Sequence, residues 1–170
     1  MILLAVDPGI RGCGVALFEN AKLVAADYVL NTVHDGNKAH EARAMASAVG
    51  NWAPRVDALA LEWPRVYASR IRGGTSKEDP NDLLALAAVD TGIAMLRPYA
   101  KAFTYVPSDW KGQCTKEACH NRIRLRLDLA ETELIDSMKI TKSKAHNALD
   151  AVGIGLHHLG RFERKRVIAA

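Results

Sequence analysis

Three acidic residues, far apart in the chain, stand where a carboxylate can be held rigidly and still be reached from solvent. Asp7 follows the apolar run 2–6, Glu62 follows the apolar run 56–61, and Asp150 lies near the end of the chain. A carboxylate at the exit of a buried strand is a good ligand for a hard divalent cation. Each residue also has a plainer interpretation, because polar residues commonly end strands and face solvent on helices. Their meeting at one place would make a metal site.

The segment around Asp150 predicts a helix that carries more polar groups beside that carboxylate. Residues three or four apart share a helix face, so His146 and Asn147 both stand next to Asp150. The same face reaches His157, for which an ordinary solvated position is the better interpretation. An imidazole or an amide next to three carboxylates could complete a divalent-metal site, and a solvated helix face is the alternative. The opposite stripe is apolar and should pack on a sheet. It consists of Ala145, Leu149, Val152, Leu156 and Leu159.

Glycines follow Asp7 closely. Asp7-Pro8-Gly9 ends the first apolar run, and Gly12 and Gly14 open the next one. Because glycine has no side chain, we expect a polyanion to be able to approach the backbone here. A tight turn built by Pro-Gly is the alternative.

Positive charge is in excess and clustered. The formal net charge of +4 and the pI near 9.1 suit an anionic partner without proving one. Basic clusters flank the acidic positions, as contact with phosphates requires, although solvated loops would look the same. We expect contacts with the phosphates of a nucleic acid from Arg65, Arg70, Arg72, Lys77, Lys111 and Lys116, and a contact with a base from Tyr67. Tyr67 could stack on an unpaired base, whereas core packing is the better interpretation of Trp63.

Bringing distant carboxylates together requires a sheet, and the sequence predicts one. Three strands joined by short turns are predicted over residues 2–6, 12–19 and 22–31. Because the turns are short, we expect the strands to form an antiparallel meander. The remaining predicted elements are helix 40–52, strand 56–61, loop 63–80, a helix from 81 or 82 to 96, strand 102–106, turn region 107–113, helix 115–129 and helix 143–159. Their order indicates one α/β domain over residues 1–160, with helices on the faces of a mixed sheet, and then a basic tail over 161–170.

Composition excludes several classes of protein. The chain has 170 residues, of which 49% are hydrophobic and 25% charged, an ordinary balance for one globular domain. We find no apolar run long enough to span a bilayer and no signal-peptide pattern in the first residues. Cys13, Cys114 and Cys119 lack zinc-knuckle spacing, so we expect reduced thiols in the cytoplasm.

The order of these features carries a resemblance. The chain has, in this order, a strand-end Asp7, a glycine-rich hairpin, a strand-end Glu62 and a late helix with His146-Asn147-x-x-Asp150-Ala151. With these features it resembles the RuvC-type Holliday-junction resolvases over roughly residues 1–160. The resemblance implies a ribonuclease-H-like fold, with a mixed five-stranded sheet flanked by helices on both faces. It also implies phosphodiester hydrolysis with two Mg²⁺ or Mn²⁺ ions per site. The catalytic residues would be Asp7, Glu62, Asp150, His146 and Lys116.

One position departs from the family pattern. Many members have an acidic residue three positions before the last one, where this chain has Asn147. Either Asn147 or His146 would then join Asp7, Glu62 and Asp150 as a metal ligand. One negative charge fewer makes the site less attractive to Mg²⁺, and an imidazole ligand shifts the preference toward Mn²⁺. The resemblance also places Lys111 and Lys116 near the scissile phosphate.

The resemblance implies a structure-selective endodeoxyribonuclease that resolves four-way junctions or other branched DNA by paired cuts. Paired cuts suit a homodimer, here in the cytoplasm of a bacterial or phage-infected cell. The apolar helix 83–96 could form the dimer interface or be a core helix. Alternatives are a non-catalytic protein that binds branched DNA and a nuclease of this fold acting on RNA–DNA hybrids, flaps or forks. An actin-type ATPase is disfavoured, because that fold needs two duplicated domains.

Overall fold

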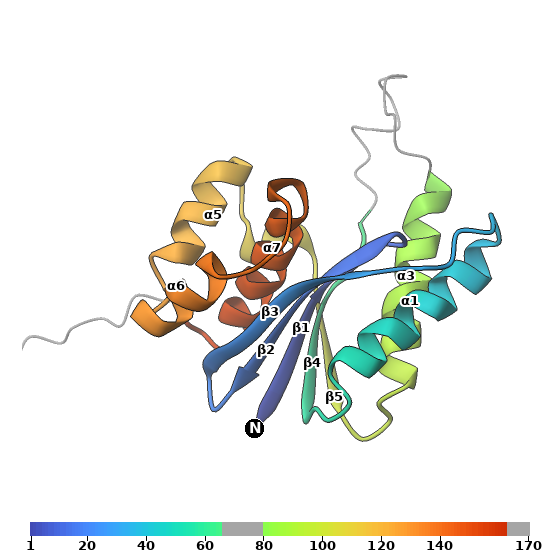
Figure 1. Ribbon diagram of the computed structural model, residues 1–170, viewed down its shortest axis with the longest axis horizontal. Helices are drawn as coiled ribbons and strands as arrows, with labels where there is room; N and C mark the ends of the chain where they lie inside the picture. The colour runs from blue at the N-terminus through green and yellow to red at the C-terminus, as the bar shows by residue number, and fades with distance from the viewer. Residues whose placement is uncertain (66–79, 163–170) are drawn as a thin grey trace, which may run out of the picture.

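A five-stranded sheet forms the centre of the protein. The computed structural model describes residues 1–65 and 80–162, and its strand order is β3-β2-β1-β4-β5 (Figure 1). The antiparallel meander consists of β1 (Ile2–Asp7), β2 (Gly12–Glu19) and β3 (Lys22–Leu30). Two strands extend it in parallel with β1, namely β4 (Ala58–Glu62) and β5 (Lys101–Tyr105). The predicted mixed α/β sheet is confirmed.

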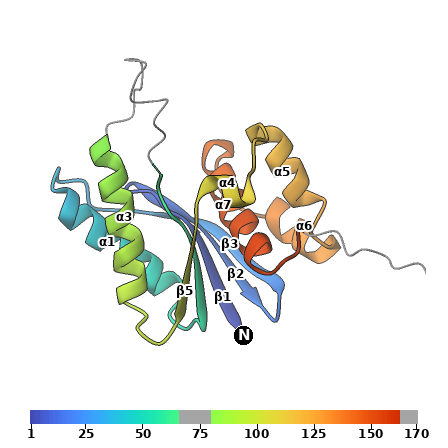
Figure 2. The same ribbon diagram turned by 180° about the vertical axis from the view of Figure 1, so that it is seen from behind.

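Helices cover both faces of this sheet, as Figures 1 and 2 show from opposite sides. One face is covered by α1 (Lys38–Trp52) and α3 (Pro80–Met95). The other face carries α7 (Lys142–His158), with α4 (Pro107–Trp110), α5 (Lys116–Arg124) and α6 (Leu129–Asp136) beside it. None of the described helices is long and apolar enough to cross a bilayer.

The side chains of the central strands alternate between two cores. In β1, Leu3 and Ala5 belong to the core under α7, whereas Leu4 and Val6 belong to the core under α1 and α3. In β4 the alanines face α7 and the leucines face the opposite core. Because the side chains beneath α7 are small, that helix can lie close to the sheet and bring its polar face to the ends of β1 and β4.

Two glycines of β2 allow this close packing. A Cβ at Gly14 would overlap the backbone carbonyl of Asn147 in α7, and a Cβ at Gly12 would overlap the ring of Tyr28. We had expected Gly12 and Gly14 to leave room for a polyanion. The structure corrects that interpretation, because the space beside these glycines is filled by the protein itself.

Between β5 and α7 the sequence-based boundaries were wrong. Residues 107–113, expected to be a turn, contain the one-turn helix α4, which begins with a proline. The single helix expected over 115–129 is two helices. Thr115 caps α5, and Asp128 forms a capping box with Glu131 that starts α6 in a new direction.

The packed part of the chain extends past residue 160. Arg161 forms an ion pair with Glu131, with Nη2 2.6 Å from Oε2, and Phe162 packs against the core under α7. Residues 163–170, the rest of the predicted basic tail, lie outside the described residues.

Candidate metal centre

Asp7, Glu62 and Asp150, called here the carboxylate cluster, come together at one edge of the sheet. In the parallel pairing of β1 with β4, Val6 lies opposite Leu61, so Asp7 and Glu62 end neighbouring strands side by side. Side-chain alternation along both strands turns them toward the face that α7 covers. There α7 carries Asp150, which is 6% exposed. The sheet and one helix thus assemble three residues that are up to 143 positions apart (150 minus 7).

The carboxylates repel one another. Burial, then the charges of Glu62 and Asp150, raise the pKa of Asp7 well above its ordinary value. Burial also raises the pKa of Glu62, although Lys111 opposes this. For Asp150, burial is outweighed by a hydrogen bond to His120 and by the charge of Lys111, which together lower its pKa. Like charges held largely out of water are what a bound cation would stabilise.

Lys111 joins two members of the cluster. Its Nζ lies 3.4 Å from Glu62 Oε2 and 3.1 Å from Asp150 Oδ2. Burial alone would lower the pKa of Lys111, but the carboxylates, Glu62 first, raise it above its ordinary value. The ammonium is therefore held charged between two acids. It also lies over the indole of Trp110, 4.5 Å from the ring centroid.

Two further side chains orient the cluster, and sequence reasoning missed both. Trp110 donates from Nε1 to Glu62 Oε2 at 2.8 Å, and His120 Nε2 lies 3.0 Å from Asp150 Oδ1. Trp110 ends α4 and is 1% exposed, while His120 lies on α5. These contacts span 48 and 30 residues. No local pattern could therefore have indicated them.

The polar residues that precede Asp150 on α7 have different surroundings. Burial raises the pKa of Tyr28 and the Asn147 side chain opposes this, so Asn147 lies beside Tyr28, and its carbonyl packs over Gly14. His146 lies one turn before Asp150 and is half-buried. His157 packs edge-on against Tyr105, with ring centroids 4.9 Å apart. Metal ligation by His146 or Asn147 stays a prediction.

The residues expected to contact DNA are only partly described. Lys116, on the first turn of α5, is exposed, and its charge lowers the pKa of Asp7, against the larger effect of burial. Arg65 is also exposed. Trp63 is 38% exposed, so the prediction that it packs in the core is wrong. The predicted contacts that lie outside the described residues are Tyr67, Arg70, Arg72 and Lys77.

The donor set fits a hard divalent cation. Within residues 1–65 and 80–162, no three or more His, Cys, Asp or Glu side chains are grouped to hold a metal ion as they stand. The Lys111 ammonium instead supplies positive charge between Glu62 and Asp150. Carboxylate oxygens already gathered around one cationic group suit Mg²⁺ or Mn²⁺. A metal ion would take over from Lys111, which must then move.

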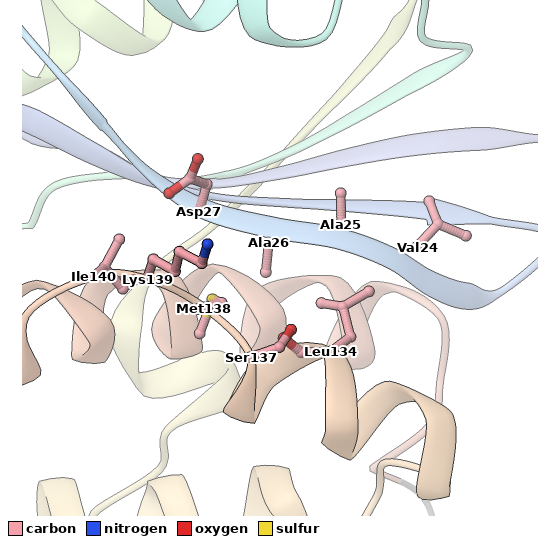
Figure 3. Close-up of a pocket in the computed structure, with 9 residues that line it drawn as sticks. All are labelled: Val24, Ala25, Ala26, Asp27, Leu134, Ser137, Met138, Lys139 and Ile140. Atoms are coloured by element: carbon pink, nitrogen blue, oxygen red, sulfur yellow. The ribbon is translucent and has the colours of Figure 1, made fainter.

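A separate hollow of about 410 Å³ lies between β3 and the end of α6 (Figure 3). It runs along the edge strand from Val24 to Asp27 and is closed by the segment from Leu134 to Ile140. Its charged lining residues are Asp27 and Lys139, one of each sign. The hollow therefore lacks the excess of one charge that an ionic ligand would need.

No protein-family model matches the chain, and no curated protein matches its sequence. Solved structures share its fold. The RuvC of Thermus thermophilus in complex with Holliday junction substrate is 17% identical, with a TM-score of 0.61 over 94% of this chain and 92% of that one. The fowlpox virus Holliday junction resolvase is 15% identical, with a TM-score of 0.57 over 94% and 98%. The yeast mitochondrial Holliday junction resolvase is 11% identical, with a TM-score of 0.57 over 96% and 81%.

These likenesses cover nearly the whole of this chain, and at such low identity they concern the fold. The chain has the ribonuclease-H-like fold of the RuvC-type Holliday-junction resolvases.

Proposed function

We propose that the protein is a divalent-metal-dependent endonuclease that cuts branched DNA, and four-way junctions in particular. One observation carries the proposal: Asp7, Glu62 and Asp150 meet at the carboxyl ends of β1 and β4. The fold likeness adds support, because the solved structures that share this fold are Holliday-junction resolvases. The basic character of the chain suits a polyanionic substrate.

The carboxylate cluster would hold the metal ions, and its neighbours would keep it in place. Mg²⁺ or Mn²⁺ ions bound there would activate water and stabilise the leaving oxygen of a phosphodiester. Trp110 and Lys111 both contact Oε2 of Glu62, so Oε1 is left for a cation. His120 fixes Oδ1 of Asp150, and a cation would replace Lys111 at Oδ2. His146 or Asn147 completes the ligand set in this proposal.

The two lysines beside the cluster would act on the substrate. With cations bound at Glu62 and Asp150, the ammonium of Lys111 would be available to bind a phosphate oxygen. Lys116 is exposed at the start of α5 and its charge acts on Asp7, so it could bind the phosphate without any rearrangement. Both charges would favour the additional negative charge that develops on the phosphate during hydrolysis.

A homodimer would place two such sites on one junction. Apolar side chains are exposed on α3, with Leu84 70% and Met95 75% exposed, and Leu96 directly after the helix is 54% exposed. Beside them, a hollow of about 650 Å³ lies between α1 and α3 and is lined largely by small side chains. Apolar surface of this kind commonly marks an interface. If it does here, Met95→Glu lowers the molar mass measured by light scattering from dimer to monomer.

Cleavage assays test the proposal directly. A four-way junction, a fork, a linear duplex and an RNA–DNA hybrid are incubated with protein in Mg²⁺ or Mn²⁺. We expect the junction to be cut best, faster in Mn²⁺ than in Mg²⁺ at equal concentration, leaving 5′-phosphate and 3′-hydroxyl ends. Asp7→Asn should abolish cutting and keep junction binding in a gel shift. Binding of the junction with no cleavage in either metal would identify a non-catalytic DNA-binding protein. Preferred cleavage of the hybrid would identify a ribonuclease.

A further inference from the structure

Asp90 is an acidic residue in the apolar interior. It lies on α3, is 0% exposed, and neither Oδ1 nor Oδ2 has a hydrogen-bond partner. A buried carboxylate without partners destabilises a fold, and such groups in proteins call for an explanation. Asp90 is also eleven positions into its helix (90 counted from 80), too far along for an interaction with the helix N-terminus. A structural role within α3 therefore does not account for it.

The helix that carries Asp90 packs under the strands that end in Asp7 and Glu62. The neighbouring Val89 packs in the same core as Val6 and Leu61, which are the residues directly before Asp7 and Glu62. α3, the helix that carries Asp90, covers the face of the sheet opposite to α7 (Figures 1 and 2). The electrostatics agree, because burial and then the charges of Asp7 and Glu62 raise the pKa of Asp90 well above its ordinary value.

The carboxylate cluster alone does not neutralise two divalent ions. Two divalent ions carry four positive charges, whereas the carboxylate cluster supplies three negative ones. Asn147, three positions before Asp150, is uncharged and lies beside Tyr28. Asp90 would restore the count from a different element of the fold.

We propose that Asp90 is the fourth carboxylate of the cation site and that it strengthens the binding of divalent ions from the α3 face of the sheet. The inference rests on the proposed function, since it concerns the same site. It explains why the protein has an unpartnered acid where an apolar residue would stabilise the fold. The buried carboxylate destabilises the protein without cations, and the same carboxylate strengthens cation binding.

Metal binding by the full-length protein, without DNA, tests this. Binding of MnCl₂ is followed by electron paramagnetic resonance of free Mn²⁺, and Tm is measured in EDTA and in MnCl₂. Asp90→Asn should bind Mn²⁺ at least about 10-fold more weakly or lose one ion, while its Tm in EDTA rises. The control is Asp82→Asn on the same helix, whose carboxylate is 59% exposed and 3.9 Å from Lys38 Nζ. It should behave as the wild type does.

The outcomes separate the two proposals. If the wild type binds Mn²⁺ and Asp90→Asn binds it with equal affinity and stoichiometry, the inference about Asp90 is overturned and the proposed function stands. If the wild type and Asp7→Asn both fail to bind Mn²⁺, the proposed function fails. Should Asp90→Asn not fold, Asp90→Leu provides the same comparison with a side chain suited to the apolar surroundings.

Discussion

Replacing Lys111 by methionine should have opposite effects on stability and on metal binding. Methionine keeps the length of the side chain and removes the charge between Glu62 and Asp150. At 3.1 and 3.4 Å each attraction is about 5 kcal/mol before desolvation, at an effective dielectric constant near 20. Removing one partner of a buried pair costs about 3–5 kcal/mol. The lower end applies here, because the Lys111 side chain is 28% exposed.

The consequence in EDTA is a lower Tm. A domain of this size changes its Tm by roughly 2–4 °C per kcal/mol, so a loss near 3 kcal/mol corresponds to about 10 °C. Mn²⁺ should narrow this difference in Tm between the two proteins. Without the ammonium as a competitor, the carboxylates of Lys111→Met should bind Mn²⁺ about 10-fold more tightly, which corresponds to about 1.4 kcal/mol. Calorimetric titration and thermal unfolding with and without Mn²⁺ measure both effects.

A matched control is Lys22→Met. The Lys22 side chain is 76% exposed and its Nζ lies 3.9 Å from Asp128 Oδ2, so its loss should cost less than about 1 kcal/mol. It should leave Mn²⁺ affinity unchanged. The reasoning is refuted if Lys111→Met unfolds in EDTA at the wild-type temperature, or if it binds Mn²⁺ more weakly than the wild type. Either result would mean that Lys111 does not occupy the place of a cation.

Three other substitutions test the surroundings of the site. His120→Ala should lower kcat about 10–100-fold with junction binding retained in gel shifts; unchanged kcat would remove its orienting role. Gly14→Ala should displace α7, since its Cβ overlaps the Asn147 carbonyl, and so lower both Tm and kcat; a wild-type Tm would contradict this packing. Glu131→Gln should destabilise the fold by about 3 kcal/mol at pH 7 by breaking the ion pair with Arg161. The pKa of Glu131 is lowered to about 2, so this stability is present above about pH 4.5 and is lost as the pH falls toward 2; equal unfolding curves for variant and wild type at pH 7 would refute it.

Local patterns predicted the part of the site that the sheet positions. The apolar run before Asp7 and the short turns after it specify an antiparallel meander. The strand before Glu62 comes after a helix, and that crossover makes it parallel to β1. Helical spacing then placed Asp150 on a polar face. All three inferences need only the hydrophobic period of a segment and the position of a turn. Both can be recognised in the sequence.

Contacts between distant segments could not be predicted from such local patterns. Trp110 and His120 belong to short helices whose boundaries were wrong, because Asp128 begins a new helix within an apparently continuous stretch. Asp90 did leave a signal. It is a single acidic residue inside a mostly apolar stretch, but periodicity alone cannot tell a buried acid from one that faces solvent.

The acids at this edge also determine how folding and cation binding are coupled. Asp7, Glu62 and Asp90 all have pKa values above their ordinary ones, with burial as the largest cause. A carboxyl group whose pKa is raised by folding stabilises the protein below its unfolded pKa and loses that contribution as the pH rises through the folded value. A bound cation opposes this loss, because it stabilises the ionised form. Divalent ions should therefore add most stability at neutral pH and above, where the acids must be charged to act as ligands.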